Sequence, residues 1–182
     1  IPLRLVGSEM CIRDRFKPII YKALKNKIPV RGYISCVSHC PYENYVDPKK
    51  VGDIAHELIQ MGCYEVSLGD TTGKGSSDQT SKVISECLKF LTPEKLAGHF
   101  HDTFQNALNN IKISLEYGIK TFDSSVGGLG GCPYSPGAKG NVSTEKVNNL
   151  LLSMGYKTNL NIAKIKECNK IALNLKEHGS YE

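Results

Sequence analysis

The sequence predicts an α/β protein of the (β/α)8 TIM-barrel type, with four strand and helix units in its 182 residues. Three observations support this fold. Short apolar strands alternate with amphipathic helices, which is typical of parallel strands joined by right-handed crossovers. Tyr33, Val66 and His99 lie on successive strands at a constant spacing of 33 residues. Polar side chains end several strands, as they do at the carboxyl ends of barrel strands.

The predicted elements recur in one order after Lys27: an apolar strand, a polar or glycine-bearing loop, and a helix. Asp47 and Pro48 begin the first helix as cap and first-turn residue, and Gly62 ends it. A doubly wound sheet is the competing fold, but no G-x-G-x-x-G motif follows any strand. Two more helical patterns lie near Thr144–Met154 and Ile162–Leu175. The expected strands are Val30–Val37, Tyr64–Leu68, Leu96–His101 and Lys120–Val126.

Residues 1–15 differ in composition from the rest of the chain. They contain three of the four arginines, and lysine supplies almost every later positive charge. Their apolar residues follow neither the period of a helix nor that of a strand. We therefore interpret 1–15 as a non-native or assembly-derived segment, and 16–182 as the part that carries the domain.

Composition excludes several classes of protein. The net charge of +5 is spread over the chain without a basic run that contains aromatic residues, so nucleic-acid binding is not expected. No apolar stretch is long enough to span a bilayer. The seven cysteines are odd in number and show no recurring pairs. We expect reduced thiols, with neither a disulfide framework nor a structural zinc.

The most informative local feature is the H-x-H motif of His99 and His101 at the end of the third strand. Alternation along a strand places both imidazoles on one side, about 7 Å apart at their Cα atoms. Such a pair suits a divalent metal, although two histidines satisfied by their neighbours are the alternative. Asp70 ends the second strand and Asp123 lies in the fourth, so polar groups gather at this edge. A site of imidazole and oxygen ligands favours magnesium, manganese or cobalt over zinc.

A glycine-rich loop, 127–141, follows the fourth strand. It contains one thiol, Cys132, followed by Pro133 and Pro136. Cysteines are usually buried and inert, but a loop buries its residues poorly, so Cys132 is the cysteine with a candidate functional role. Asn141 ends the loop and is either a turn residue or a neutral oxygen ligand.

Four segments together resemble the hydroxymethylglutaryl-CoA lyase family: RGYISCVSHCPYE, GCYEVSLGDTTGKG, HFHDTFQNAL and DSSVGGLGGCPYSPGAKGN. The resemblance runs from about Pro29 to His178. Related condensing enzymes share chiefly the H-x-H strand and lack the G-G-C-P-Y loop. The resemblance implies that 16–182 is the C-terminal half of a pyruvate-carboxyltransferase-like TIM-barrel domain, with the last four βα units and the C-terminal helices of the barrel.

The resemblance also implies residue roles. The implied ligands of a divalent cation, Mg²⁺ or Mn²⁺, are His99, His101 and Asn141. Acid or base roles are implied for Cys132 and Asp70, and a position behind the ligands for Glu145. The residues expected to bind substrate are Arg31, Tyr33 and Thr71. An aspartate ligand and a catalytic arginine of the family are not matched, since Arg13-Asp14 is followed by Arg15 where the family has glycine.

The implied reaction cleaves 3-hydroxy-3-methylglutaryl-CoA to acetyl-CoA and acetoacetate by metal-assisted retro-Claisen chemistry. Without the unmatched ligand and arginine, the chain alone is expected to have negligible activity. The parent enzyme is expected to be a homodimer, and the cytoplasm is the default compartment, with the mitochondrial matrix as the alternative. Two other functions stay open: a Claisen-condensing acyltransferase of the isopropylmalate or homocitrate synthase type, and a non-catalytic half-barrel that associates through its open edges.

Overall fold

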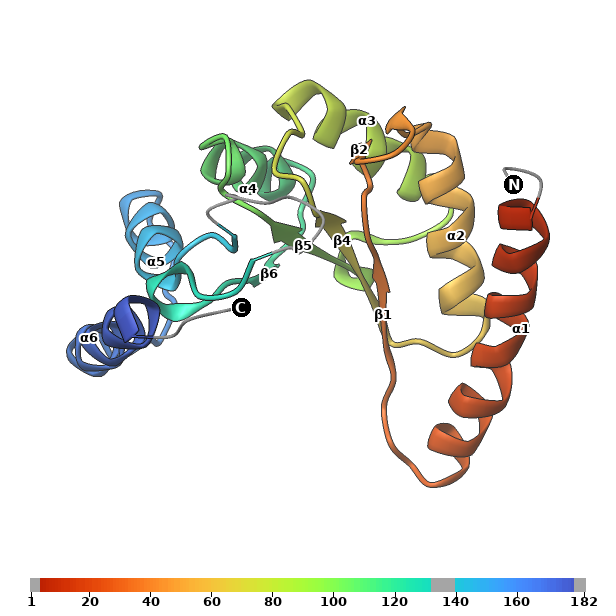
Figure 1. Ribbon diagram of the computed structural model, residues 1–182, viewed down its shortest axis with the longest axis horizontal. Coiled ribbons are helices and arrows are strands. Elements are labelled where there is room, and N and C mark those ends of the chain that lie inside the picture. Colours follow the sequence, from red (N-terminus) through yellow and green to blue (C-terminus); the bar gives the residue numbers. More distant parts are fainter. Residues whose placement is uncertain (1–3, 132–139, 179–182) are drawn as a thin grey trace.

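The computed structural model describes residues 4–131 and 140–178 (Figure 1). Four strands form the central sheet: β1 (Arg31–Ile34), β4 (Glu65–Asp70), β5 (Leu96–Phe100) and β6 (Thr121–Asp123). A small hairpin consists of β2 (His39–Cys40) and β3 (Asn44–Tyr45). The helices are α1 (Arg4–Lys25), α2 (Pro48–Gln60), α3 (Ser77–Cys87), α4 (Ala107–Glu116), α5 (Thr144–Ser153) and α6 (Ile162–His178). Short 3-10 turns are η1 (Pro93–Lys95) and η2 (Val126–Gly128).

The central sheet is parallel throughout, in the order β1-β4-β5-β6. A helix lies between each strand and the next in sequence, which is the repeat of a (β/α) barrel. The predicted fold class and the four predicted strands are confirmed. Within the described residues, β1 and β6 each pair with one strand only, so the sheet has two open edges.

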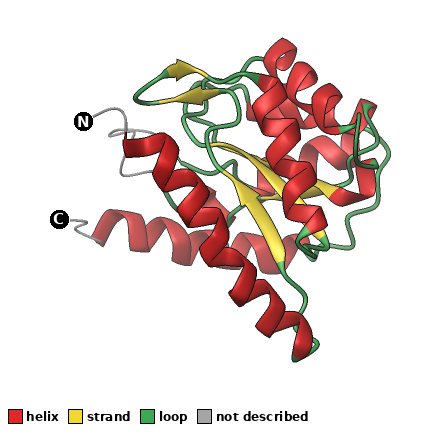
Figure 2. Ribbon diagram, turned by 90° about the vertical axis from the view of Figure 1, so that its right-hand side faces the viewer, coloured by secondary structure: helices red, strands yellow, loops and turns green. Residues whose placement is uncertain are grey.

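Helices α2, α3 and α4 cover one face of the sheet, and α1 and α6 lie at opposite ends of the molecule (Figures 1 and 2). Alternation on β4 turns Val66 and Leu68 toward these helices, where they join the hydrophobic core. Helical core residues packed with them are Val51, Ala55, Val83 and Ile84. The other set of side chains is polar and lies on the opposite face, called here the inner face: Arg31, Glu65, Ser67, His99 and Asp123.

The strand ends differ from the predicted ones because contacts distant in sequence set them. β1 stops at Ile34 rather than Val37, since Cys36 takes a φ of 59° and turns the chain. β6 ends at Asp123, since the Ser125 backbone N–H donates to Val142 O (3.2 Å) and not to β5. The hairpin of β2 and β3 was not predicted; Asn44, with a φ of 62°, closes its turn.

Residues 4–15 of the N-terminal segment fold as part of α1, although 1–15 has no helical period. The end of this helix docks on the domain through Ile20, which is buried, and Leu24, which packs against Gly62. A non-native origin of 1–15 stays a prediction. No helix within residues 4–131 or 140–178 combines the length and apolar content needed to cross a membrane.

Ser76 caps α3 with a reciprocal pair of hydrogen bonds. The Gln79 backbone N–H donates to Ser76 Oγ (3.3 Å), and the Ser76 N–H donates to Gln79 Oε1 (3.0 Å). We expect Ser76→Ala to lower the free energy of unfolding by about 1 kcal/mol, because a helix N–H loses its acceptor. Urea unfolding measures the change. Ser77→Ala, one position after the cap, is the control, and equal losses for both variants would contradict the capping role.

Candidate metal and substrate site

A cavity of about 380 Å³ opens at the carboxyl ends of β1, β4 and β5. Its size suits a small-molecule ligand. Four of the predicted site residues line it: Tyr33, Thr71, His99 and His101. The hairpin of β2 and β3 contributes Cys40 with the adjoining Pro41 and Tyr42. Strand ends and hairpin together place apolar and polar groups around one space.

The two histidines of the H-x-H motif meet at this cavity as predicted. Their ring centroids are 5.5 Å apart and the rings are tilted by 46°. His101 is buried at 6% exposure, and its Nδ1 is a buried atom without a hydrogen-bond partner. Burial and the nearby His99 lower the pKa of His101, against a hydrogen bond to the Thr71 backbone that raises it. His101 is therefore held neutral, as a metal ligand must be.

Asn141 lies beside His101 through an isolated antiparallel bridge. Its side-chain Nδ2 donates to Leu129 O (2.9 Å), and its backbone N–H donates to Gly130 O (3.2 Å). The side-chain bond occupies the amide nitrogen, so the atom that remains for a ligand is the carbonyl oxygen Oδ1. The structure thus brings together His99, His101 and Asn141, which lie up to 42 residues apart in sequence.

A network of charged and polar side chains lies on the inner face next to His99. Arg31 Nη1 donates to both oxygens of Asp123 (2.8 and 3.0 Å), and Arg31 Nε donates to Glu65 Oε2 (2.6 Å). Arg31 Nη1 also donates to the Tyr33 hydroxyl. Ser67 Oγ donates to Asp123 Oδ2 (2.8 Å), and His99 Nδ1 lies 3.2 Å from the same oxygen. Asp123 is the acceptor shared by three elements of the sheet.

The network keeps its charges at neutral pH. Burial raises the pKa of Asp123, but hydrogen bonds from His99, Ser67 and Arg31 outweigh it and hold the pKa at about 2. Burial lowers the pKa of Arg31, and its bonds to Asp123 and Glu65 outweigh that effect and raise the pKa. Asp123, Glu65 and Ser67 were not predicted as site residues. The signal available in the sequence was a polar residue at each alternate position of the buried strand β4.

Asp70, predicted as an acid or base, is not brought together with the histidine pair. It follows the Val66 and Leu68 side of β4, toward the helices, and is 1% exposed. Its oxygens accept hydrogen bonds from Ser38 Oγ (2.8 Å) and the Gly75 N–H (2.9 Å). Burial raises the pKa of Asp70, and these hydrogen bonds lower it by less.

The other predicted residues lie around the site in different ways. Thr71 Oγ1 accepts from the Cys36 backbone N–H (2.9 Å) beside the cavity. Glu145, in the first turn of α5, accepts from the Gly127 N–H with both oxygens (3.2 Å each). It therefore holds the start of the glycine-rich loop that leads to Asn141. Cys132 lies outside the described residues.

The residues present fit a divalent cation. Nδ1 of His101 is buried and unpartnered, the imidazole of His99 is a neighbour of the His101 ring, and Asn141 adjoins His101 through the backbone bridge. Nitrogen and neutral oxygen donors without thiolate suit Mg²⁺ or Mn²⁺ better than a closed structural zinc site. In the part of the chain that the structure describes, no three His, Cys, Asp or Glu side chains cluster as a metal site. The candidate site has two histidines, and its third donor would be the amide of Asn141.

A parallel α/β sheet with a cavity at the carboxyl ends of its strands places the chain among (β/α)-barrel proteins. The sequence signature of the HMGL-like family matches residues 10–171, and the chain belongs to this family.

Relatives agree with the resemblance seen in the sequence. Hydroxymethylglutaryl-CoA lyase of Pseudomonas mevalonii is 47% identical over 154 residues, covering 85% of this chain and 51% of the relative. The 3-hydroxy-3-isohexenylglutaryl-CoA/hydroxy-methylglutaryl-CoA lyase of Pseudomonas aeruginosa is 52% identical over 149 residues, covering 82% and 50%. The crystal structure of HMG-CoA lyase from Brucella melitensis superposes with a TM-score of 0.88 at 43% identity, covering 90% and 58%. The chain spans about half the length of the curated relatives it matches.

Proposed function

We propose that the protein containing this chain cleaves 3-hydroxy-3-methylglutaryl-CoA to acetyl-CoA and acetoacetate. The observation that carries the proposal is the pair of His99 and His101 in the lining of one cavity, with Asn141 bridged to His101. The sequence of the chain is also 47% and 52% identical to two relatives named as hydroxymethylglutaryl-CoA lyases. The unmatched aspartate and arginine implied by the family leave the 182-residue chain alone with negligible expected turnover.

The three residues would hold Mg²⁺ or Mn²⁺, and the bound cation would supply Lewis-acid stabilisation of negative charge on a substrate oxygen. Tyr33 and Thr71, which line the cavity, and Arg31, behind Tyr33, are proposed to orient the substrate. Orientation of this kind lowers the entropic part of the barrier.

The proposed reaction moves two protons. A base removes the proton of the tertiary hydroxyl, the carbon–carbon bond to the thioester arm breaks, and its electron pair passes to the acetyl-CoA enolate. Acetoacetate leaves, and the thiol of Cys132 protonates the enolate carbon. Asp70 is kept as a proposed acid-base group because burial raises its pKa. Its contact toward the cavity runs through Ser38, which donates to Asp70 and lies two residues before the cavity-lining Cys40.

The proposed partner is the coenzyme A thioester, and the proposed assembly of the complete enzyme is a homodimer. The cytoplasm is the proposed compartment, with the mitochondrial matrix as the alternative, because lyases of both compartments occur among the relatives.

The test is an assay of acetoacetate release from 3-hydroxy-3-methylglutaryl-CoA by the complete gene product with Mg²⁺ or Mn²⁺. We expect His99→Ala and Cys132→Ala each to lower kcat/KM by at least about 100-fold, because each removes a group used in the transition state. His56→Ala is the matched control, because His56 stacks on Phe90 among the outer helices (centroids 4.9 Å apart).

No acetoacetate from a folded, metal-loaded protein would contradict the lyase function. Release of free CoA from acetyl-CoA and a 2-oxo acid by the same protein would then identify a condensing enzyme. Full turnover by His99→Ala would remove the histidine pair from the mechanism and leave the family membership unchanged.

A further inference from the structure

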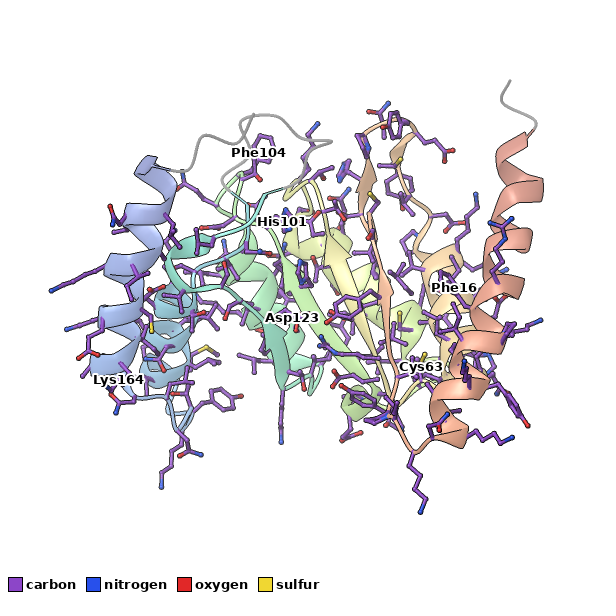
Figure 3. All side chains as sticks on the ribbon, turned by 60° about the horizontal axis from the view of Figure 1, so that its bottom comes forward. Phe16, Cys63, His101, Phe104, Asp123 and Lys164 are labelled. Atoms are coloured by element: carbon purple, nitrogen blue, oxygen red, sulfur yellow. The ribbon has the colours of Figure 1, made fainter. Side chains whose placement is uncertain are left out.

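The ion pair of Arg31 and Asp123 crosses the inner face from one edge of the sheet to the other. Arg31 lies on β1 and Asp123 on β6, the two outermost strands, with β4 and β5 between them. Figure 3 shows Asp123 and His101 in the region between the terminal helices α1 and α6. The pair therefore spans the strands that carry Ser67 and His99.

The carboxylate of Asp123 is surrounded by donors. Oδ1 faces Arg31 Nη1 (2.8 Å), while Oδ2 faces Arg31, Ser67 Oγ (2.8 Å) and His99 Nδ1 (3.2 Å). An ionised carboxylate only accepts hydrogen bonds, so the hydrogen shared with His99 must be carried by the imidazole. In neutral His99 the proton then lies on Nδ1, and the lone pair lies on Nε2.

His101 has the opposite arrangement. Its Nδ1 is buried without a partner, and the ring makes a hydrogen bond to the Thr71 backbone. A backbone carbonyl accepts, so the proton of neutral His101 lies on Nε2 and its lone pair on Nδ1. The two neighbouring imidazoles, 5.5 Å apart, both line the cavity and carry their protons on different nitrogens.

We propose that Asp123 is a positioning residue that fixes His99 as the Nδ1–H tautomer and presents its Nε2 lone pair to the cavity, with Arg31 anchoring the carboxylate. Glu65 anchors the guanidinium in turn, through Arg31 Nε (2.6 Å). Carboxylates behind metal-binding imidazoles set tautomer and ring orientation in this way. The link to metal binding rests on the proposed function, whereas the tautomer of His99 does not.

Asp123→Ala tests the proposal because it removes both acceptor oxygens beside His99 Nδ1. Asparagine would not test it, since its carbonyl oxygen can take the place of Oδ2, which faces Arg31 (3.0 Å), Ser67 and His99. Without the carboxylate, we expect His99 to adopt the Nε2–H tautomer that imidazoles favour in water. That tautomer removes the lone pair from the cavity side.

The measurement is the ¹⁵N multiple-bond NMR spectrum of the histidine rings in the 182-residue chain, at a pH where the imidazoles are neutral. The wild-type chain should show Nδ1–H for His99, and Asp123→Ala should show Nε2–H. His101 serves as an internal control because Thr71 holds its tautomer, and an unchanged His101 signal also reports an intact fold. Glu65→Gln is the matched variant, since it alters the far side of Arg31 and should leave the His99 tautomer unchanged.

A His99 that stays Nδ1–H in Asp123→Ala, or is Nε2–H in the wild-type chain, would overturn the proposal. Asp123→Leu is the second variant, since it removes the same two oxygens and fills more of their space. If Asp123→Ala fails to fold, Asp123→Leu decides by the same signal.

Binding of Mn²⁺ to the complete gene product, followed by water proton relaxation, gives a separate measurement. We expect Asp123→Ala to weaken Mn²⁺ binding about 10- to 100-fold relative to Glu65→Gln. A switched tautomer with unchanged Mn²⁺ affinity would sink the metal role of His99 and support the positioning of its ring by Asp123. An unswitched tautomer overturns the positioning whatever the metal affinity does.

Discussion

Gly140→Ala is expected to lower the free energy of unfolding by about 3 kcal/mol or more, and to displace Asn141 from His101. Gly140 has a φ of 78°, where a side chain costs about 1–2 kcal/mol. A Cβ at this position would lie 1.6 Å from the backbone oxygen of Gly130, so the two segments must separate. That movement breaks the bond from the Asn141 N–H to Gly130 O (3.2 Å).

Gly155→Ala is the matched control for this prediction. Gly155 has a similar φ of 83°, but a Cβ there meets nothing within 4 Å. It isolates the cost of the backbone conformation from the cost of the clash. Urea unfolding gives the two free energies, and Mn²⁺ binding by the complete protein reports the position of Asn141. Equal losses of stability and unchanged Mn²⁺ affinity in both variants would contradict the close packing of Gly130 and Gly140.

Asp70→Ala is expected to lower the free energy of unfolding by about 2–4 kcal/mol, because it strands two buried donors. The Ser38 hydroxyl and the Gly75 N–H would lose their acceptor inside a core where Asp70 is 1% exposed. Asp78→Ala, which removes a largely exposed partner of Lys82, should change stability by less than about 0.5 kcal/mol. A loss as small as that of the control would show that water reaches these donors.

The raised pKa of Asp70 adds a dependence on pH to the same comparison. The folded chain binds the proton of Asp70 more tightly than the unfolded chain does. Its contribution to stability is therefore fully present below the ordinary aspartate pKa, and part of it is lost as pH rises through the raised value. Relative to Asp70→Asn, which does not titrate, the wild-type chain should lose stability over this window. Unfolding free energies of both chains, measured from pH 4 to pH 7, give the difference directly.

Local signals in the sequence predicted most of the fold. Asp47 accepts from the Lys49 N–H (3.0 Å) at the start of α2, as its cap position indicates. Ser143 caps α5 in the same way, and the four parallel strands occur where apolar runs were found. The hairpin of β2 and β3 was missed because its strands have two residues each, too few to show alternation.

The site was predictable only in part. The histidine pair follows from alternation along one strand, and both histidines line the cavity. The contact of Arg31 with Asp123 joins residues 92 positions apart, and it depends on the order of the strands, which no local pattern contains. Asp70 lies on the helix side because it follows Val66 and Leu68 in alternation along β4. The prediction considered only that Asp70 ends a strand and did not use this alternation.

The edge-to-edge ion pair also affects how the sheet opens. Edge strands normally exchange their amide hydrogens independently, since each can separate from its one neighbour without disturbing the other edge. Here β6 cannot detach without withdrawing Asp123 from Arg31, and β1 cannot detach without withdrawing Arg31 from Asp123. Opening of either edge removes an interaction of the opposite edge, so the opening of β1 and the opening of β6 are coupled by the free energy of this ion pair, although the two strands share no backbone hydrogen bond.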